Sequence, residues 1–278
     1  MSFTWSPQET PPEVRISNWG WVRVVLRGLV LLLVLLSGVV IMAVLRLIER
    51  PLHGLARPWT PWITVVVSRL CLRILGLRQT VDGQIMAQNG ALVANHSSWL
   101  DIFALNGATP LYFVSKSEVA SWPGIGLLAK ITGTVFIARE RKQARAQQNL
   151  FEARLRAGHR LVFFPEGTST DNFRVLPFKS TLFQAFFSDG LRDTLYIQPL
   201  SVIYTAPRGQ DPRFYGWWGD MEFGPHALTL LATRQGGSVR IVCHAPIPVR
   251  DMTDRKALAQ AAEAAVRAGM PEARQGNA

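Results

Sequence analysis

Cysteine is scarce in this chain of 278 residues, in which only Cys71 and Cys243 are present. The sequence has no CxxC pair and no cluster of histidine with cysteine. A disulfide framework and a structural zinc site both need such residues in repeated spacings, so neither is expected. No other metal site is expected, and the low cysteine count fits a reducing, cytoplasmic setting.

Acidic residues are also few. Nineteen Asp and Glu stand against 30 Lys and Arg, which gives a formal net charge of +11 at pH 7. This excess suits an anionic partner, such as nucleic acid, an anionic membrane surface or an acidic carrier protein. Hydrophobic residues make up 48% of the chain, which excludes disorder over most of its length and allows one full core. A long apolar segment favours the membrane over nucleic acid.

That segment runs from Gly28 to Leu45 and contains no charged side chain. Its length is at the threshold for a helix that crosses a bilayer, and arginines and tryptophans flank it. A signal peptide is a weaker interpretation because no small-residue cleavage site follows the segment. A buried core helix is the other alternative, which is disfavoured because the segment is apolar on every face.

A second apolar stretch, 59–77, is interrupted by Arg69 and Arg73, which share one face of a helix. The other face is apolar and consists of Val66, Leu70, Ile74 and Leu77. Each arginine would cost roughly 2.5–3.5 kcal/mol at the centre of a bilayer, so this helix is predicted to lie in the membrane interface. The expected organisation is a juxtamembrane segment (1–20), membrane-anchoring helices (21–80), an α/β domain (81–270) and a tail (271–278).

Short apolar strand candidates alternate with helical patterns beyond the turn at Asp82-Gly83. This alternation predicts an α/β fold in which helices flank a mixed, mostly parallel sheet, preceded by the hydrophobic helical membrane anchor. Segment 204–225, with its pair Trp217-Trp218, is predicted as a long surface loop. The predicted strands are 91–94, 111–115, 134–137, 161–164, 195–203 and 238–244, and the predicted helices are 101–107, 118–130, 140–157, 178–188 and 255–268.

Chemistry in such folds lies where strands end and helices begin. Strand 91–94 runs into His96 with Asp101 five residues later, and strand 161–164 ends at Pro165 and Glu166. An imidazole takes up a proton near neutral pH, and a nearby carboxylate fixes its tautomer. His96 and Asp101 are therefore a candidate base and its partner. The spacing alone favours a structural histidine, and the position at a strand end makes the two interpretations equal.

The segment NHSSWLD, residues 95–101, matches the NHxxxxD block of the glycerolipid acyltransferases, the family of 1-acylglycerol-3-phosphate acyltransferases. FPEGT at 164–168 matches a second signature of that family. GTVFIAR at 133–139 resembles a third block, apart from Ala138, and IQPL at 197–200 resembles a fourth. Four blocks in the right order make the resemblance specific.

The resemblance implies that His96 acts as general base on the hydroxyl of a lysolipid acceptor while Asp101 orients it. Ser97 and Ser98 are then not nucleophiles, in keeping with the lack of a GxSxG motif around them. The acyl donor would be a thioester of acyl carrier protein or coenzyme A, used as a co-substrate, and no cofactor is expected. The residues expected to bind the acceptor's polar group are Arg139, Glu166, Gly167 and Thr168.

One departure concerns the acceptor. Members that acylate lysophosphatidate commonly carry arginine directly after EGT, whereas this chain has Ser169 there and Asp171 two residues later. A missing guanidinium and an added carboxylate disfavour a phosphate acceptor. The stretch 164–183 resembles lyso-ornithine lipid acyltransferases, so an aminolipid acceptor is preferred to lysophosphatidate. Ser169, Asp171 and Lys179 are candidate head-group contacts, with Asp171 alternatively a turn residue and Arg174 alternatively the source of positive charge.

The arginine-rich segment 139–160 is a candidate surface for docking an acidic carrier protein, although anionic lipid or solvent suits it as well. Phe113, Trp122 and Trp99 are candidates to line an acyl tunnel, with core packing as the alternative. The expected location is the cytoplasmic membrane, with the catalytic domain on its cytoplasmic face and no nucleic acid bound. The alternatives from other classes are a catalytically silent lipid-binding membrane protein and a hydrolase that admits water instead of the alcohol.

Overall fold

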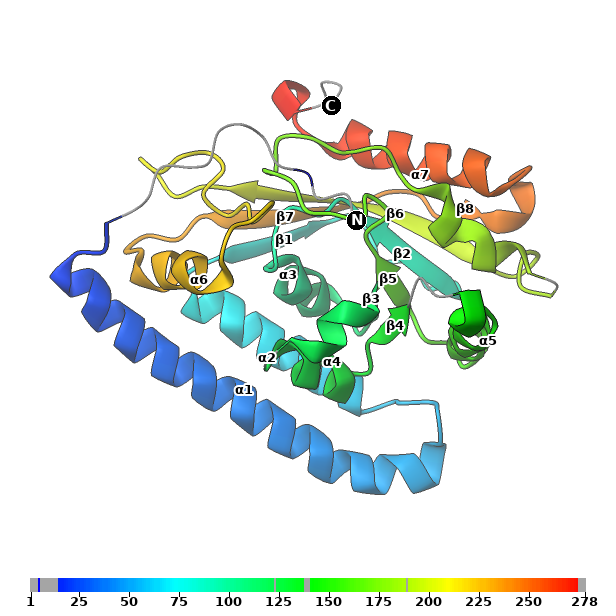
Figure 1. The fold of residues 1–278 in the computed structure, drawn as a ribbon, viewed down its shortest axis with the longest axis horizontal. Coiled ribbons are helices and arrows are strands. Elements are labelled where there is room, and N and C mark those ends of the chain that lie inside the picture. Colours follow the sequence, from blue (N-terminus) through cyan, green and yellow to red (C-terminus); the bar gives the residue numbers. More distant parts are fainter. Residues whose placement is uncertain (1–4, 6–14, 123, 138–140, 189, 275–278) are drawn as a thin grey trace.

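One sheet of eight strands lies at the centre of the computed structural model, which describes residues 5, 15–122, 124–137, 141–188 and 190–274 (Figure 1). The order across the sheet is β1-β7-β6-β2-β5-β3-β4, and β8 pairs with β6. The strands are β1 (Arg78–Asp82), β2 (Gly90–Ala94), β3 (Tyr112–Lys116), β4 (Val135–Ile137), β5 (Leu161–Phe163), β6 (Tyr196–Thr205), β7 (Ser238–Cys243) and β8 (Ile247–Pro248).

The middle of the sheet is parallel. β2 lies between β6 and β5, with Ala94 opposite Leu200 and Val93 opposite Phe163. β3 and β4 continue in the same direction, whereas β7 and β8 run antiparallel to β6. The predicted mixed, mostly parallel sheet is therefore confirmed, and its parallel strands bring their carboxyl ends to one edge.

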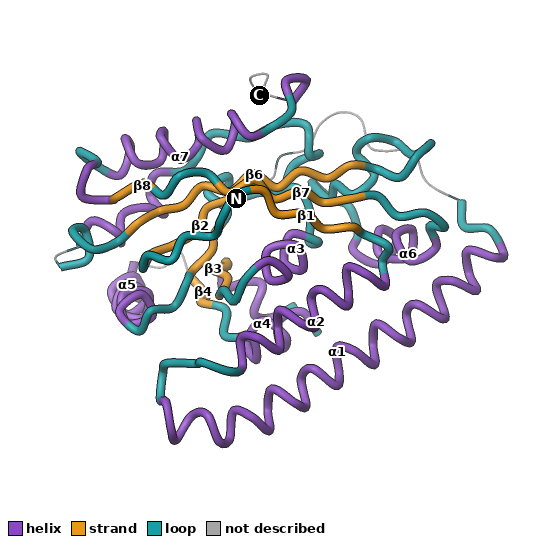
Figure 2. Tube along the Cα trace, turned by 180° about the vertical axis from the view of Figure 1, so that it is seen from behind, coloured by secondary structure: helices purple, strands orange, loops and turns teal. Residues whose placement is uncertain are grey.

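Helices cover both faces of this sheet. The helices in the described part of the chain are α1 (Asn18–His53), α2 (Thr60–Ile74), α3 (Asp101–Ala108), η1 (Ser117–Ser121), α4 (Ile125–Thr132), α5 (Arg141–Arg156), η2 (Ser180–Phe187), α6 (Phe223–Ala232), η3 (Val249–Asp251), α7 (Arg255–Gly269) and η4 (Glu272–Arg274), where η marks a 3-10 helix. Alternate residues of β2 point to opposite faces. Ala91 and Val93 enter a core covered by α5, α7 and η2, and Leu92 and Ala94 enter a core covered by α2, α3 and α6. Views from the front and from behind place α7 on one side of the sheet and α2 and α3 on the other (Figure 1, Figure 2).

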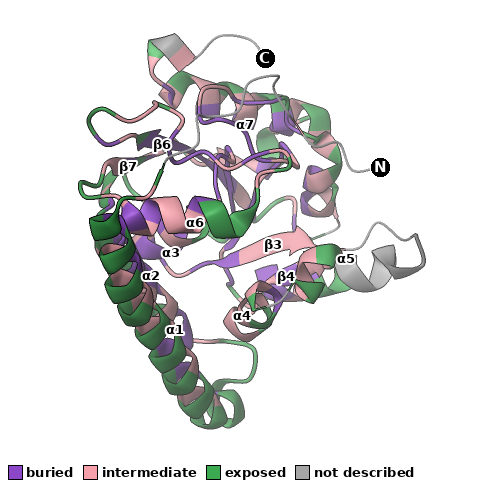
Figure 3. Ribbon diagram, turned by 60° about the vertical axis from the view of Figure 1, so that its left-hand side comes forward, coloured by how far each residue is buried: buried purple, intermediate pink, exposed green. Residues whose placement is uncertain are grey.

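α1 lies outside this helical layer and exposes most of its apolar side chains (Figure 3). Within the described residues it is the one helix long and apolar enough to cross a membrane, and 11% of its most apolar window is buried. Its 36 residues span about 54 Å at about 1.5 Å per residue. Leu33 and Leu47 are 65% and 78% exposed, so the helix presents a surface that water does not favour.

Hydrogen bonds from two arginines link the amino-terminal part of α1 to α6 of the α/β domain. Nε of Arg23 donates to the carbonyl oxygen of Ala232 at 2.7 Å, and Nη1 of Arg27 donates to that of Thr233 at 2.6 Å. These oxygens lie at the carboxyl end of α6, where a helix carries partial negative charge. The two arginines that flank the apolar segment thus bind protein in addition to any lipid.

Hydrogen bonds to Glu49 link the carboxyl-terminal part of α1 to the amino end of α2. The buried carboxylate of Glu49 accepts the backbone N–H groups of Trp59 and Thr60, at 2.7 and 3.0 Å, at the amino end of α2. A negative charge at this position complements the helix dipole. Between the two ends, Gly38 faces Val67 of α2 so closely that an added Cβ would lie 2.5 Å from its Cγ2.

α2 meets the prediction for the second anchor helix only in part. Val66 and Leu70 are exposed, as expected of an apolar face, but Leu77 is buried. Nε of Arg69 donates to the carbonyl oxygen of Gly107 at 2.7 Å, at the carboxyl end of α3. Because α2 contacts both α1 and α3, it covers the sheet as well as contributing to the exposed apolar surface.

The predicted loop over 204–225 is confirmed between residues 206 and 222, but its two ends belong to regular elements and its middle is not a surface segment. β6 continues to Thr205, α6 begins at Phe223, and the aromatic side chains between them are buried, with Tyr215 and Trp218 only 3% and 2% exposed. Proline and glycine in this segment break regular structure, but its aromatics still pack under the sheet. The predicted helix 178–188 is the 3-10 helix η2, and β1, β8 and α6 were not predicted.

Candidate active site

The carboxyl ends of β2, β5 and β3 meet at one edge of the sheet, and the candidate residues lie on the loops that follow. His96 follows β2, Glu166 and Gly167 follow β5, and Lys116 is the last residue of β3. Because these strands are parallel neighbours, residues far apart in the sequence are brought to the same place.

His96 and Asp101 lie together, as their spacing predicts. Nδ1 of His96 is 2.7 Å from Oδ2 of Asp101, which is fully buried at the first turn of α3. A hydrogen bond from Nδ1 to the carboxylate leaves Nε2 as the nitrogen that can accept a proton. The imidazole ring stacks on Phe164, with centroids 4.1 Å apart and planes at 13°, which holds its orientation.

Asp101 receives hydrogen bonds on both carboxylate oxygens. Oδ2 also accepts the backbone N–H groups of Ser97 and Ser98, at 2.9 and 3.1 Å, and Oδ1 accepts the hydroxyl of Tyr204 at 2.7 Å. Burial, together with the charge of Asp101, raises the pKa of Tyr204 well above its usual value, so the phenol remains a donor. These donors replace the water that a buried carboxylate loses.

Glu166 holds the main chain of His96. Its Oε1 accepts the backbone N–H of His96 at 2.7 Å, and its Oε2 accepts that of Leu176 at 2.8 Å. The carboxyl group is buried, and burial raises its pKa to about 8, against the two N–H donors. The backbone of His96 is also held at its carbonyl oxygen, which accepts the N–H of Thr170 at 2.9 Å. Each oxygen of Glu166 could accept a further bond, but the residue is only 1% exposed, so little of it is accessible to a lipid acceptor.

Two ammonium groups approach the loop at Gly167. Nζ of Lys116 donates to the carbonyl oxygen of Gly167 at 2.9 Å, and Nζ of Lys179 would lie 2.6 Å from a Cβ added at position 167. Gly167 has φ of 72°, a conformation that favours glycine. The hydroxyl oxygen of Thr168 accepts the backbone N–H of Trp5 at 3.3 Å. Positive charge therefore gathers on the loop that holds His96.

Asp171 is paired inside the same loop. Its carboxylate forms a two-bond ion pair with Arg174, at 3.1 and 3.2 Å, and accepts the backbone N–H of Phe173 at 3.0 Å. Asn172 follows with φ of 69°, which a turn requires. The geometry thus favours the turn interpretation of Asp171 over a contact with a cationic head group. Ser169 is nearly buried, at 9% exposure.

Arg139 lies outside the described residues, so its contact with the acceptor stays a prediction. In α5, which follows it, Arg154 points inward: it is 6% exposed, donates to the carbonyl oxygen of Gly133 at 2.7 Å and lies 4.3 Å from the ring of Tyr112. Burial lowers its pKa to about 10. Arg160 also donates to two internal oxygen atoms. Arg154 and Arg160 are therefore not part of a surface that could dock a carrier protein.

The three aromatic residues predicted to line an acyl tunnel lie in different parts of the structure, and only Phe113 lies beside His96's stacking partner. Phe113 stacks beside Phe164, with centroids 6.1 Å apart, and so lies next to the ring that supports His96. Nε1 of Trp99 donates to Nδ1 of His226 at 2.9 Å, which is a packing role. Trp122 is 43% exposed. Of the three, Phe113 has the position that an acyl chain near the base requires.

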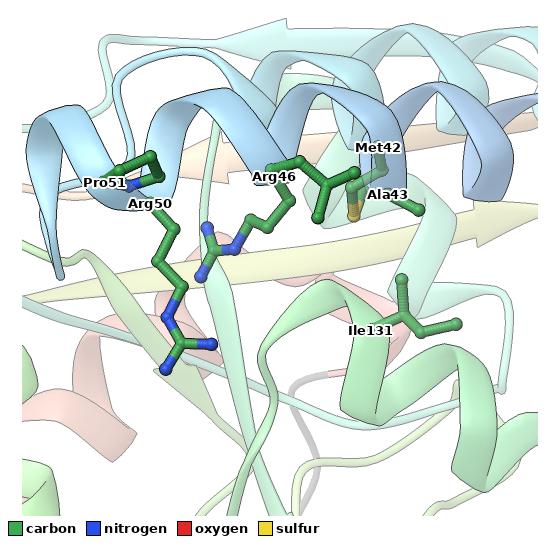
Figure 4. A pocket seen from close by; sticks show the side chains of 7 residues that line it. Met42, Ala43, Arg46, Arg50, Pro51 and Ile131 are labelled. Carbon is green, nitrogen blue, oxygen red and sulfur yellow. The ribbon is translucent and has the colours of Figure 1, made fainter.

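A cavity of about 360 Å³ lies between the end of α1 and α4 (Figure 4). No predicted site residue lines it, so it is separate from the His96 site; its lining is Met42, Ala43, Arg46, Leu47, Arg50, Pro51 and Ile131.

Over the part of the chain that the structure describes, no group of three or more His, Cys, Asp or Glu side chains is placed to hold a metal ion.

The sequence blocks and the geometry agree with known proteins. The family model described as Acyltransferase matches residues 78–203, which include His96, Asp101 and Glu166. A lyso-ornithine lipid O-acyltransferase of Rhodobacter capsulatus is 56% identical over 266 residues, which is 96% of each chain. The chain belongs to the acyltransferase family. Another relative of this acyltransferase is the lyso-ornithine lipid O-acyltransferase of Rhizobium meliloti, 37% identical over 76% of this chain and 73% of the relative.

Two further similarities concern 1-acylglycerol-3-phosphate acyltransferases. The one from Neisseria gonorrhoeae is 41% identical over 106 residues, 37% of this acyltransferase and 42% of the relative. A crystal structure of the one from Thermotoga maritima has a TM-score of 0.56 at 20% identity, covering 88% of this chain and 96% of that chain. This second likeness concerns the fold, whose α/β class and long apolar helix agree with the prediction.

Tyr204 is a partner of Asp101 that the motifs did not reveal. It falls one residue after the predicted strand 195–203, at the start of the segment predicted to be a loop. The alternation of Leu200, Val202 and Tyr204 places all three in the core beneath α3. Extending the predicted strand by two residues would have placed Tyr204 on its core face, but not against Asp101, which depends on the pairing of β6 with β2.

Proposed function

We propose that this acyltransferase transfers a fatty acyl group from an acyl thioester to the hydroxyl of a lysolipid, with a lyso-ornithine-type aminolipid as the preferred acceptor. The observation that carries the proposal is the 2.7 Å contact of His96 Nδ1 with Asp101, which leaves Nε2 able to take the proton of a hydroxyl. Acyl carrier protein or coenzyme A supplies the thioester.

The reaction needs one proton carrier and no acyl-enzyme. Nε2 of His96 removes the proton of the acceptor hydroxyl as its oxygen attacks the thioester carbonyl carbon. The tetrahedral intermediate collapses, the carbon–sulfur bond breaks, and the imidazolium returns the proton to the leaving thiolate. Asp101 stabilises the imidazolium between these steps. Ser97 and Ser98 contribute backbone N–H groups to Asp101 and no nucleophile.

The lysines beside Gly167 suit a carboxylate on the acceptor. An ornithine amide carries a free carboxylate and an ammonium group, so Lys116 and Lys179 are placed for the first of these. Asp171 is neutralised by Arg174 and is less suited to the ammonium group. The names of the relatives from Rhodobacter capsulatus and Rhizobium meliloti support the same acceptor. The rival acceptor, lysophosphatidate, would use the same lysines through its phosphate.

An acceptor panel tests the proposal. Purified full-length protein is incubated with acyl carrier thioester or acyl coenzyme A and with lyso-ornithine lipid or lysophosphatidate, and the acylated product is quantified. Product from lyso-ornithine lipid at a higher kcat/KM supports the preferred acceptor, whereas product from lysophosphatidate alone overturns it. His96→Ala should abolish transfer, and retained transfer would end the assignment of His96 as base.

The same panel separates the other classes of function. Release of free fatty acid without an acceptor would reveal a hydrolase. Absence of any transfer by the unmodified chain, together with binding of the lysolipid, would indicate a lipid-binding membrane protein.

We further propose that α1 lies within one leaflet of the cytoplasmic membrane, with the catalytic domain on the cytoplasmic face. Arg23 and Arg27 fasten its start to α6, and Glu49 fastens its end to α2. A helix of about 54 Å is longer than the hydrocarbon core of about 30 Å, but a helix held by one domain at both ends cannot place those ends on opposite sides.

Cysteine labelling at both ends of α1 tests this placement. Arg15→Cys and His53→Cys each add an exposed thiol at one end. With a membrane-impermeant maleimide, neither site should react in spheroplasts, and both should react after the membrane is opened. Reaction of one site in intact spheroplasts would show that α1 crosses the bilayer, with a thiol on a secreted reporter as the positive control.

A further inference from the structure

Two asparagine side chains continue the ladder of β6 beyond the point where β2 leaves it. β2 pairs with β6 as far as Ala94 opposite Leu200. Asn95 then donates from Nδ2 to the carbonyl oxygen of Val202 at 2.9 Å and accepts the N–H of Val202 on Oδ1 at 2.7 Å. A side-chain amide offers one donor and one acceptor, as a peptide group does, so it can replace a strand neighbour.

Asn172 repeats this arrangement two residues further along β6. Its Nδ2 donates to the carbonyl oxygen of Tyr204 at 2.9 Å, and its Oδ1 accepts the N–H of Tyr204 at 3.1 Å. Asn172 is buried and belongs to the loop that holds His96, and its φ of 69° places the amide against the strand. The backbone of Tyr204 is therefore fixed by a loop of the site itself.

The side chain of Tyr204 uses this fixed position. It is fully buried, and its hydroxyl donates to Oδ1 of Asp101 at 2.7 Å. Oδ2 of the same carboxylate binds His96 and the amino end of α3. A carboxylate held on both oxygens cannot rotate about its Cβ–Cγ bond without breaking a bond on each side, so Tyr204 restrains the oxygen that faces His96.

We propose that Tyr204 is a positioning residue for acyl transfer, which acts on His96 through Asp101. The inference rests on the proposed roles of His96 and Asp101. The phenol hydrogen bond draws part of the negative charge of Asp101 away from the imidazolium. It therefore sets the geometry of the pair and also the pH at which His96 becomes a base.

Other ionisable groups lie close to this chain of contacts. The ring of Tyr215 is 5.7 Å from that of Tyr204, and its hydroxyl accepts the N–H of Gly237 at 2.7 Å. Nη1 of Arg274 donates to the carbonyl oxygen of Tyr204 at 3.0 Å. The charge of Asp101 acts on Glu166, which also feels Arg267. A test must therefore change the Tyr204 hydroxyl alone and leave these neighbours in place.

Tyr204→Phe removes that hydroxyl and keeps the ring. With purified full-length protein, lyso-ornithine lipid and acyl carrier thioester, kcat should fall about ten- to a hundredfold, the value of a hydrogen bond to a charged group. KM should stay the same. The acid-side midpoint of the kcat/KM profile should move to higher pH by about half a unit to one unit, since the unshared charge of Asp101 stabilises the imidazolium.

Tyr215→Phe is the matched control, because it also removes one buried tyrosine hydroxyl from the same aromatic pair. Its thermal midpoint should fall, while kcat and the acid-side midpoint of the profile should equal those of the parent. A tyrosine that matters only for packing would behave in this way at position 204 as well.

A second substitution keeps the proposal testable if Tyr204→Phe does not fold. 3-Fluorotyrosine incorporated at position 204 keeps the hydroxyl and makes it a stronger donor, so the acid-side midpoint should move to lower pH. A midpoint that does not move, or moves the other way, in either variant overturns the proposal. Activity retained by His96→Ala would instead overturn the proposed function, whatever the Tyr204 variants do.

Discussion

Glu166 is expected to make the stability of the protein fall as the pH rises through neutrality. Its buried carboxyl group has a pKa of about 8, raised from an ordinary value of 4.5 by burial. Between these values the folded protein keeps a proton that the unfolded chain has lost. Stability from this group is fully present below about pH 4.5 and is lost as the pH passes about 8, with a slope of at most about 1.4 kcal/mol per pH unit.

The effect of Glu166 on stability is best measured above pH 6.5, because buried histidines oppose it at lower pH. His159 and His226 are buried, and burial lowers the pKa of each to about 4. Their effect has the opposite sign, because protonation of the unfolded chain between pH 6.5 and 4 lowers stability. Above pH 6.5 the effect of the histidines fades as the unfolded chain loses their remaining protons, whereas Glu166 should still remove about 2 kcal/mol between pH 6.5 and 8.

Glu166→Gln keeps the shape of the side chain and removes its titration. Urea unfolding of the parent and the variant, in detergent micelles at four pH values from 6.5 to 8, gives the two slopes. The parent should lose about 2 kcal/mol more than Glu166→Gln over this range. Parallel slopes would refute the reasoning, because they would mean that the N–H donors of His96 and Leu176 outweigh burial and keep Glu166 ionised.

Gly38→Leu should lower the free energy of unfolding by about 1–3 kcal/mol, since an added Cβ would lie 2.5 Å from Cγ2 of Val67 and force α1 away from α2. Gly28→Leu, where nothing lies within 4 Å, is the control in the same thermal unfolding assay; an equal loss at both positions would contradict the packing argument. Asp171→Asn should cost about 1–3 kcal/mol, because it breaks the two-bond ion pair of a carboxylate that is only 4% exposed. It should leave the ratio of the two acceptor rates unchanged, because Arg174 already neutralises Asp171. A changed ratio would return Asp171 to the head-group site.

The part of the site that depends on local spacing could be predicted from the sequence. His96 and Asp101 are joined by one turn and the start of α3, so their contact depends only on local structure within five residues. The order of strands and helices was also readable, because the parallel strands are continuous apolar runs between turns. Leu161–Phe163 and Gly90–Ala94 are of this kind.

The contacts that depend on register could not be predicted. Tyr204 reaches Asp101 only because β6 lies beside β2 and extends past it, which no local pattern states. From the sequence, Arg69 was predicted on the polar face of an interfacial helix and Arg154 in a basic docking segment, yet each donates to a backbone carbonyl. A carbonyl at a helix end or in a turn can receive an arginine, but its position becomes known only with the fold.

The loop after β5 has a consequence for altering the choice of acceptor. Glu166 and Thr170 hold the N–H and the carbonyl of His96, and Gly167 between them is where the two lysines gather. On the roles proposed above for His96 and the lysines, acceptor choice and rate would both depend on this one short segment of backbone. A substitution that reshapes this loop for another head group will also shift the imidazole, so broad acceptor range and fast turnover should trade against each other, and new specificities are better sought in side chains that reach the loop from β3 or η2.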